Sequence, residues 1–297
     1  MPKLGDHQSK TTTKMLFVGD SGAGKTDALA SLAAAGYHLH IMDMDNGLDV
    51  LNNLLTSPEG QYCKLNPKCA DNVDFVTITD QMKNINGRLV PKTATAWTRA
   101  VKLLMDWQDG DQKLGPITTW SPNDILVIDS LTMLSTAALN MILSMNGRLG
   151  QRPHQSDWGD GQQLVESMLQ MLYDEGVQCN VIVCCHITFL GEEGGPLRGY
   201  PNTLGKALPP KVGRYFNTAL MARTTGQGTS LRRKILTNTS GVIELKNTAP
   251  MRVLPEYPLE TGLADYFKAV RSTTPVIPSG AQAQSPTPAL LGKPTST

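Results

Sequence analysis

The chain has 297 residues, 40% of them hydrophobic, and a formal net charge of +1. This length allows one large α/β domain or two small ones, and the hydrophobic content is enough for a sizeable core. No apolar run approaches the roughly 20 residues that cross a bilayer, and the polar stretch 1–14 lacks the apolar segment of a secretory signal. Five unevenly spaced cysteines favour reduced thiols over a disulfide framework. We therefore expect a cytoplasmic protein without a membrane partner.

After a flexible arm, residues 1–13, the sequence predicts a strand at Met15–Val18 and then a glycine-rich loop. Residues 19–26 read G-x-x-x-x-G-K-[ST], the spacing of a phosphate-binding loop. Its glycines lack the Cβ that hinders positive φ, so the backbone can curl around a phosphate and point N–H groups inward. A helix over 26–34 adds the positive end of its dipole. The predicted phosphate contacts are Gly19, Asp20, Ser21, Gly22, Ala23, Gly24, Lys25 and Thr26.

Two side chains at the end of this loop have more specific roles. Lys25 is expected to reach the β- and γ-phosphates of a nucleoside triphosphate, and the Thr26 hydroxyl is expected to hold Mg²⁺. The alternative interpretation is a chance glycine-rich turn. The strand–loop–helix context favours the phosphate-binding loop.

A second predicted strand, 38–42, ends in the acidic sequence Asp43-Met44-Asp45. Side chains at the carboxyl ends of strands next to a phosphate loop lie where α/β sheets bind ligands. The stretch 52–71 is rich in Pro, Gly and Asn and predicts a loop. Cys63 and Cys69 fall in this loop, and because no second Cys or His pair is nearby, ordinary loop cysteines are favoured over a zinc site.

A further acidic strand end follows the apolar run 125–128, which closes on Asp129 in a Walker B pattern. A buried parallel strand of this kind delivers a carboxylate beside the phosphate loop, where it can orient Mg²⁺ through water. Many buried strands end in Asp, so the pattern gains its weight from the phosphate loop that precedes it. Periodicity also predicts a strand over 73–78, a hairpin over 84–90, and helices over 94–109, 130–146 and 162–174.

The apolar run 181–185 predicts another buried strand, and His186 follows it. Because this strand end is expected at the same edge of the sheet, a role for His186 as a sensor of the γ-phosphate is favoured over a purely structural histidine. The segment 189–215 is rich in Gly and Pro and predicts a long loop or hairpin before a short helix near 211–216. Beyond it we expect edge strands over 218–225 and 230–237, a strand over 241–246, a helix over 263–270 and a disordered tail from 272.

The weak net charge conceals an asymmetry. Between Arg198 and Arg252 the chain has ten basic residues and one acidic residue, Glu244. A basic region beside a nucleotide site favours a polyanionic partner or the phosphates held by a neighbouring subunit. The alternative is a solvated basic face.

Taken together, the phosphate loop, the Asp43-Met44-Asp45 strand end, the Val-Ile-Asp-Ser strand and the strand that ends at His186 resemble the RecA/RadA-type ATPase core. The closer resemblance is to the short phage-encoded ATPases of the Sak recombination and annealing group, over roughly residues 14–270. It implies an α/β P-loop NTPase fold with a mainly parallel central sheet, flanking helices and antiparallel edge strands. The implied domain spans 14–271, and the tail spans 272–297.

The resemblance also implies the chemistry of the site. ATP would lie on the phosphate loop, with Mg²⁺ held by Thr26 and, through water, by Asp129. Asp45 stands where related enzymes have a glutamate that activates water, and its side chain is one methylene shorter, which implies slow hydrolysis. Lys25 and His186 complete the implied catalytic set. Basic residues implied to contact DNA or a neighbour's nucleotide are Lys206, Arg223 and Lys246.

The implied function is Mg²⁺-dependent ATP hydrolysis on single-stranded DNA in phage recombination, annealing or replication. The subunits would form a ring or filament, and a single-strand-binding protein is a further implied partner. The alternative is an ATP-gated loading or remodelling protein with little or no DNA-stimulated hydrolysis. A small-molecule kinase is disfavoured, although the basic residues of 198–252 could mimic a lid.

Overall fold

A computed structural model of the chain describes residues 12–191, 196–239 and 241–273. In this part of the chain the central sheet has eight strands, in the order β14-β13-β12-β1-β9-β8-β2-β3. The strands from β12 to β3 run parallel, and β13 and β14 extend one edge antiparallel. The predicted fold class is confirmed. The bounds are β1 (Lys14–Val18), β2 (His38–Asp43), β3 (Val73–Thr77), β8 (Asp124–Asp129), β9 (Asn180–Cys185), β12 (Thr218–Thr225), β13 (Arg232–Leu236) and β14 (Glu256–Pro258).

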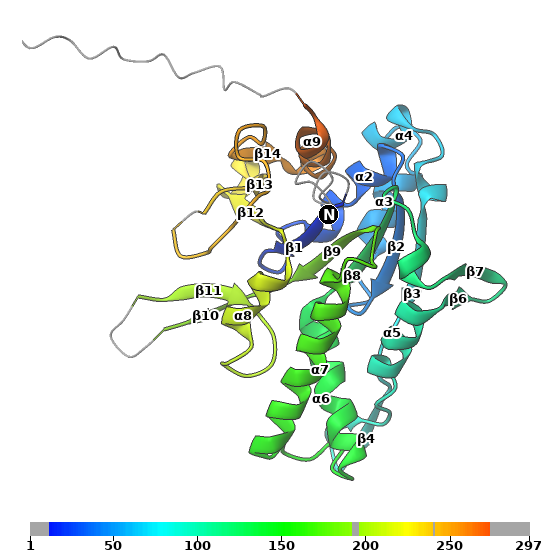
Figure 1. The fold of residues 1–297 in the computed structure, drawn as a ribbon, viewed down its shortest axis with the longest axis vertical. Helices are drawn as coiled ribbons and strands as arrows, with labels where there is room; N and C mark the ends of the chain where they lie inside the picture. Colours follow the sequence, from blue (N-terminus) through cyan, green and yellow to red (C-terminus); the bar gives the residue numbers. More distant parts are fainter. Residues whose placement is uncertain (1–11, 192–195, 240, 274–297) are drawn as a thin grey trace, which may run out of the picture.

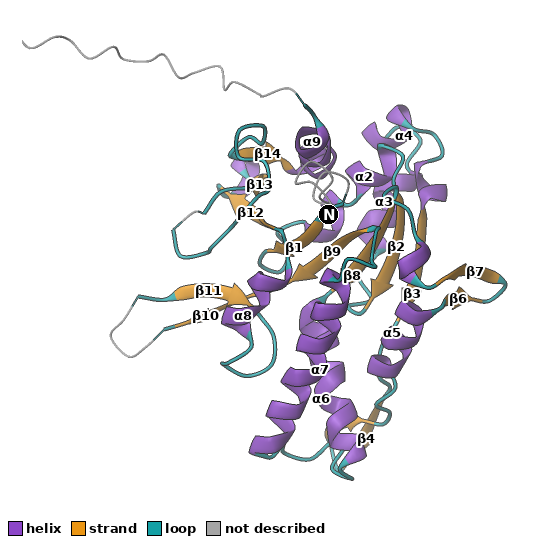
Figure 2. Cartoon of the chain, viewed as in Figure 1, coloured by secondary structure: helices purple, strands orange, loops and turns teal. Residues whose placement is uncertain are grey.

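Helices cover both faces of this sheet (Figures 1 and 2). On one face, Leu16 of β1 packs in a core with α5 (Ala96–Met105), α6 (Leu131–Met145) and α7 (Gln155–Tyr173). On the other, Phe17 packs in a core with α1 (Lys25–Ala28), α2 (Ala30–Ala34), α3 (Asp49–Thr56), α4 (Gln61–Leu65) and α9 (Leu259–Arg271). Because successive strand side chains point to opposite faces, a strand with two covered faces is apolar throughout. The central strands β1, β8 and β9 were therefore recognisable as unbroken apolar runs.

In the residues that the structure describes, three antiparallel hairpins lie outside the central sheet. The predicted hairpin over 84–90 is confirmed as β4 (Met82–Ile85) and β5 (Arg88–Pro91). The segment after His186 also forms a hairpin, one of the two alternatives for that stretch. Its strands are β10 (Ile187–Leu190) and β11 (Arg198–Pro201). The remaining elements are β6 (Trp107–Asp109), β7 (Gln112–Gly115), α8 (Pro209–Val212) and the short 3-10 turns η3 (Cys69–Asn72), η4 (Ile117–Thr119), η5 (Gly213–Tyr215) and η6 (Gly228–Ser230).

The prediction of a loop over 52–71 is wrong, because most of this stretch is helical. Helices α3 and α4 and the turn η3 occupy it, joined by the tight turn 57–60. Leu51 and Leu55 belong to α3, lie one helical turn apart and are both buried. The Pro and Gly residues therefore mark a turn between two helices, and the apolar spacing of the leucines was the overlooked signal.

Three further predictions change. Helix α7 begins at Gln155 rather than 162 because a capping box starts it early, with the Asp157 carboxylate accepting the His154 N–H at 2.7 Å. The strands predicted over 218–225 and 230–237 as edge strands, β12 and β13, are both internal, because β12 lies between β1 and β13, and β13 lies between β12 and β14. Residues 241–246 form isolated bridges in place of the expected strand.

The two ends of the predicted domain are partly visible. Thr12 and Thr13, the last residues of the predicted arm, are buried, and Thr13 pairs with Asn180. The rest of the arm, 1–11, and the predicted disordered tail from 274 onward lie outside the described residues. Among the helices of the described ranges, none is long and apolar enough to cross a bilayer.

Asn180, the first residue of β9, joins three segments that are distant in sequence. Its Oδ1 accepts hydrogen bonds from the Thr13 N–H at 2.8 Å and the Arg271 guanidinium at 2.9 Å. Its Nδ2 donates to the Pro122 carbonyl at 2.5 Å. Asn180 is fully buried, so water cannot replace these partners.

We expect Asn180→Ala to lower the free energy of unfolding by about 2–4 kcal/mol, since each buried polar group left unpaired costs about 1–3 kcal/mol. Chemical denaturation measures the loss. The matched control is Asn84→Ala, in an exposed hairpin where the Asn84 side chain accepts the Gly87 N–H, and it should cost less than about 1 kcal/mol. Equal losses for the two variants would contradict the role given to Asn180.

Candidate nucleotide-binding site

The carboxyl ends of the central strands bring the predicted site residues to one edge of the sheet. Strand β9 lies between β1 and β8, so His186 follows a strand that separates the phosphate loop from Asp129. In the ladder, Asp129 is paired with Cys184 on one side and with Asp43 on the other. The sheet therefore gathers the loop, the histidine and the acidic strand ends along one edge.

The glycines of the phosphate loop are required by its backbone. Gly22 and Gly24 have φ values of 75° and 92°, a region that L-residues with a side chain rarely adopt. At Gly19 an added Cβ would lie 2.8 Å from the Ala222 carbonyl oxygen, and at Gly24 it would collide with the side chain of Leu259. The loop thus keeps the close curvature that points successive N–H groups toward an anion.

Lys25 lies across the loop that precedes it. Its buried Nζ donates to the carbonyl oxygens of Gly19 at 2.9 Å and Asp20 at 3.1 Å. Hydrogen bonds from an ammonium to charged phosphate oxygens are stronger than those to neutral carbonyls. A triphosphate in the loop would therefore compete well for this ammonium, so the loop and Lys25 fit the predicted cofactor.

Thr26 and Asp129 meet directly. The Thr26 hydroxyl donates to Asp129 Oδ2 at 2.7 Å, across 103 positions of sequence. The pKa of Asp129 is raised to about 6, chiefly by burial; the nearby Asp45 and Asp43 act in the same direction as burial, while Thr26 and Lys25 oppose the shift. A buried carboxylate whose charge is disfavoured in this way gains from a cation beside it.

The acidic strand ends are held by neighbouring donors. The Ser130 hydroxyl donates to Asp45 Oδ1 at 2.9 Å. Asp43 accepts the Gly47 N–H at 3.2 Å and the Thr77 hydroxyl at 3.3 Å. Within the described ranges, no three or more His, Cys, Asp or Glu side chains are arranged to hold a metal by themselves. Proteins bind Mg²⁺ through one or two carboxylates together with substrate phosphates and water.

His186 lies between the loop and the acidic cluster. Its pKa is lowered by burial and then by the charge of Lys25, while Asp45 and Asp20 act in the opposite direction. The Thr132 hydroxyl, at the start of α6, accepts the His186 N–H at 3.3 Å and donates to the Asn202 carbonyl at 2.9 Å. The backbone around the histidine is therefore fixed, and the neutral imidazole is favoured near Lys25.

Of the three predicted basic contacts, Arg223 lies nearest the loop. It lines a cleft of about 740 Å³ that residues 20–23 of the loop also line. Lys206 is exposed on the turn after β11. Lys246 pairs through its backbone with Ala219, near the start of β12 and away from the site edge, and burial lowers its pKa.

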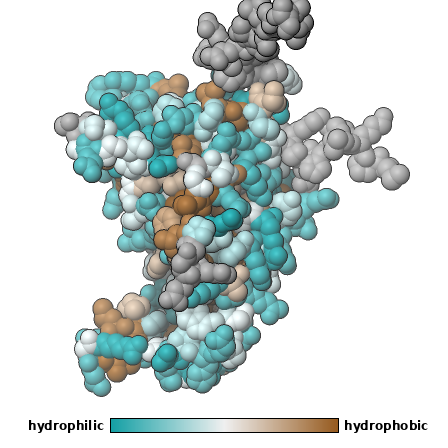
Figure 3. Space-filling view, turned by 90° about the vertical axis from the view of Figure 1, so that its left-hand side faces the viewer, coloured by the Kyte–Doolittle hydropathy of each residue, from teal (hydrophilic) through white to brown (hydrophobic). Residues whose placement is uncertain are grey.

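The cleft beside Arg223 has an apolar side. Exposed apolar residues on its lining are Phe189 of β10, Leu231 and Val242, each more than two-fifths exposed. Apolar side chains gather in the middle of the face shown in Figure 3. The cleft therefore offers apolar surface, a guanidinium and the outer side of the phosphate loop together.

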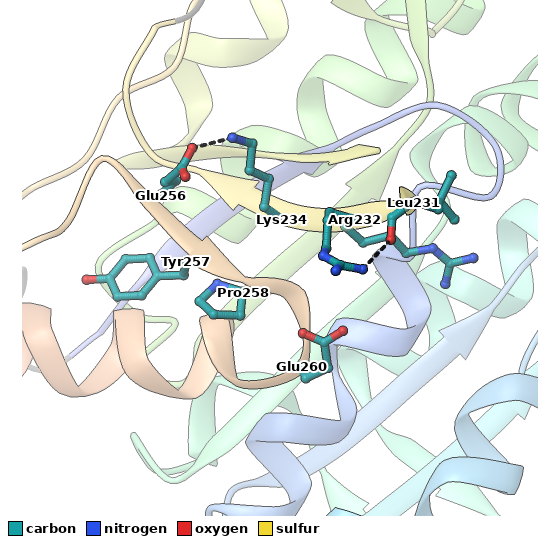
Figure 4. Close-up of a pocket in the computed structure, with 8 residues that line it drawn as sticks. Leu231, Arg232, Lys234, Glu256, Tyr257, Pro258 and Glu260 are labelled. Carbon is teal, nitrogen blue, oxygen red and sulfur yellow. Dashed lines mark hydrogen bonds and ion pairs between the residues drawn. The ribbon is translucent and has the colours of Figure 1, made fainter. Parts of the chain in front are cut away.

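Several residues around the site were missed in the sequence. Ser130 holds Asp45, and Arg233 of β13 forms an ion pair with Asp27 of α1 at 2.7 Å. Arg233 also helps to line a pocket of about 550 Å³ with Lys234, Glu256 and Glu260, shown in Figure 4. No local pattern in the sequence indicates that β13 packs beside the phosphate loop, because this contact joins segments about 200 residues apart.

Comparison with known proteins places this site in a family. A family model described as an AAA domain matches residues 11–213, more than half of the chain. The chain belongs to the AAA domain family. The matched region of this AAA domain contains the phosphate loop, Asp45, Asp129 and His186. No curated protein sequence matches the chain.

Solved structures similar to this AAA domain are distant in sequence. The KaiC-like protein PH0186 of Pyrococcus horikoshii OT3 is 13% identical, with a TM-score of 0.41 over 83% of this chain and 84% of that one. The RadB recombinase is 13% identical, with a TM-score of 0.42 over 77% and 81%. The flagellar accessory protein FlaH of Methanocaldococcus jannaschii is 11% identical, with a TM-score of 0.39 over 84% and 87%.

We expect Asp129→Asn to stabilise the nucleotide-free AAA domain at pH 7, because it removes a charge that burial disfavours. A carboxyl whose pKa is raised from 3.8 to about 6 on folding contributes stability below pH 3.8 and loses it as the pH rises through 6. Thermal unfolding should show a gain of about 1–3 kcal/mol at pH 7 that shrinks toward pH 4.

The control for this experiment is Asp109→Asn, at an exposed position. It should change the unfolding free energy by less than about 0.5 kcal/mol at both pH values. A loss of stability in Asp129→Asn at pH 7 would contradict the conclusion that burial disfavours the charge of Asp129.

Proposed function

We propose that this AAA domain binds ATP with Mg²⁺ and hydrolyses it while acting on single-stranded DNA. The observation that carries the proposal is the 2.7 Å contact between Thr26 and Asp129, directly beside a phosphate loop crossed by Lys25. Magnesium supplies electrostatic stabilisation of the charge that develops on the phosphates. The Thr26 hydroxyl would hold the ion directly, and Asp129 would hold it through water.

Hydrolysis would use the residues between the loop and the second strand end. The carboxylate of Asp45, oriented by Ser130 at 2.9 Å, would accept a proton from the attacking water. His186 follows the strand between the phosphate loop and Asp129, which suits a donor to the terminal phosphate. Lys25 would neutralise charge on the β- and γ-phosphates.

Single-stranded DNA is the proposed polyanion. The β10–β11 hairpin presents Phe189, which is 49% exposed, and aromatic faces can stack on bases without sequence preference. The basic segment 198–252 supplies charge for the DNA backbone. We place the protein among phage Sak-type recombination and annealing ATPases, with a single-strand-binding protein as a further partner.

Assembly into a ring or filament would bring cations from one subunit to the nucleotide of the next. Arg223 lies beside its own phosphate loop, whereas Lys206 and Lys246 lie on other parts of the chain. We therefore propose Lys206 and Lys246 as contacts with a neighbouring subunit or DNA, and Arg223 as a contact within the cleft. A cation supplied in trans is worth about 10³–10⁵ in rate in GTPases.

One observation favours a second function, an ATP-gated loading or remodelling protein. Asp45 is shorter than the glutamate it replaces, and its Oδ1 is engaged by Ser130. Both features reduce its reach toward a water molecule at the terminal phosphate. Slow hydrolysis without DNA stimulation would fit a protein whose task is to bind and release a partner.

We expect Asp45→Asn to reduce kcat for ATP hydrolysis by about 10²–10⁴, the usual contribution of a general base, while the Kd for ATP stays within about threefold, roughly 0.7 kcal/mol. Steady-state hydrolysis and titration with a fluorescent ATP analogue measure the two effects. Lys25→Ala should instead lose ATP binding. An unchanged rate in Asp45→Asn would remove Asp45 from the mechanism, and unchanged affinity in Lys25→Ala would refute the phosphate-loop assignment.

ATP hydrolysis measured with and without single-stranded DNA separates the two functions. We expect DNA to raise the rate, and the stimulation to fall as salt increases, because phosphate contacts release counterions. Double-stranded DNA and the Lys25→Ala variant are the controls. A rate that single-stranded DNA leaves unchanged would favour the loading function.

A further inference from the structure

Cys63 and Cys69 lie next to each other on the side of the molecule away from the β10–β11 hairpin. Their Sγ atoms are 3.9 Å apart. Cys63 belongs to α4 and Cys69 begins the turn η3. Both thiols donate to the carbonyl oxygen of Leu55 at the end of α3, at 3.0 Å and 3.4 Å. The fold thus places both sulfur atoms beside the same carbonyl oxygen.

Cys63 differs from the other four cysteines in its exposure to solvent. All five are free thiols. Cys179, Cys184 and Cys185 lie in or beside β9 with no exposed surface, and burial raises the pKa of each thiol. Cys69 is also fully buried, whereas Cys63 is partly exposed. A reagent in solution therefore has access to Cys63, with Cys69 directly behind it.

A metal site does not explain the pair. Structural zinc takes four ligands, and no group of three or more His, Cys, Asp or Glu side chains could hold a metal among the residues that the structure describes. Two adjacent thiols without further ligands are instead arranged for reaction with each other.

We propose that Cys63 and Cys69 form a dithiol site that small-molecule disulfides oxidise to an intramolecular disulfide bond. The Cys63 thiolate attacks the disulfide, forming a mixed disulfide and releasing one thiolate. Cys69 then attacks the Cys63 sulfur, closes the Cys63–Cys69 bond and releases the second thiolate. Two protein thiols lose two electrons, the reagent gains them, and the two thiol protons pass to the released thiolates.

The geometry sets the order and the pace of these steps. The sulfurs must approach from 3.9 Å to the disulfide bond length of about 2.05 Å. Burial raises the pKa of the Cys69 thiol, so its thiolate is scarce at neutral pH and ring closure should accelerate as the pH rises. Closure also removes both S–H donors from the Leu55 carbonyl.

The two cysteines lie beside the apolar core that packs against α1 and α2, the helices that follow the phosphate loop. Leu55 and Cys69 belong to the same apolar core as Ala28 of α1 and Ala30 of α2. Tyr62, next to Cys63, donates its hydroxyl to the Glu260 carbonyl of α9 at 2.9 Å. Figure 1 shows α3 and α4 beside α2. Oxidation would therefore cross-link α4 to η3. These elements support the nucleotide site, and the cross-link itself would make no contact with the nucleotide.

The test is incubation of the folded full-length protein with oxidised glutathione, followed by intact-mass and peptide mass spectrometry. We expect a loss of two hydrogens and a cross-link between Cys63 and Cys69. In Cys69→Ser a glutathionyl group should accumulate on Cys63, and in Cys63→Ser Cys69 should stay reduced. Closure in the wild-type protein should be faster at pH 8 than at pH 7.

Three results would overturn the proposal. A stable glutathionyl adduct on Cys63 of the wild-type protein would show that Cys69 cannot reach it. A cross-link to Cys179, Cys184 or Cys185, or no reaction at all, would show that the pair is not the reactive site. The wild-type map decides the question even if a variant folds poorly, and none of these readouts depends on ATP hydrolysis.

Discussion

The hydrogen bond between Thr26 and Asp129 is the contact on which the site depends. It joins the first turn after the phosphate loop to the end of β8, a strand two positions away in the sheet. The contact exists because β9 is inserted between β1 and β8 and all three strands run parallel. The same arrangement places His186 beside the loop, and Ser130, which follows Asp129, in reach of Asp45. One sheet order thus positions every element of the proposed chemistry.

The fold supports this site at an electrostatic cost. Asp129, Asp45 and Asp43 gather at one edge, and burial raises the pKa of Asp129 to about 6. Lys25 offsets part of this charge while bound to carbonyls of its own loop. A site with partly compensated acids and an ammonium on neutral acceptors is suited to a ligand that carries both phosphate and a divalent cation. The two apolar cores on either face of the sheet hold the strand ends in place.

The surface around the β10–β11 hairpin differs from the region around α3 and α4. On one side, the β10–β11 hairpin and residues 241–243 border a cleft with exposed apolar surface and Arg223. On the other, α3, α4 and η3 pack tightly against the phosphate-loop helix and bring two thiols together. The first side suits contact with a polyanion or another subunit. The second side packs against α1 and α2, the helices that follow the phosphate loop.

The sequence by itself determined the phosphate loop, the acidic strand ends and the central strands. Each depends on local requirements: glycines where φ is positive, as at Gly22 and Gly24, and unbroken apolar runs where both faces are covered. The helical nature of 49–65 was also readable from Leu51 and Leu55, but its Pro and Gly obscured it. Only the tertiary structure decided that Ser130 holds Asp45, that Arg233 meets Asp27 and that Cys63 adjoins Cys69. These contacts depend on how the chain turns and packs, and side-chain type at a single position does not specify a distant partner.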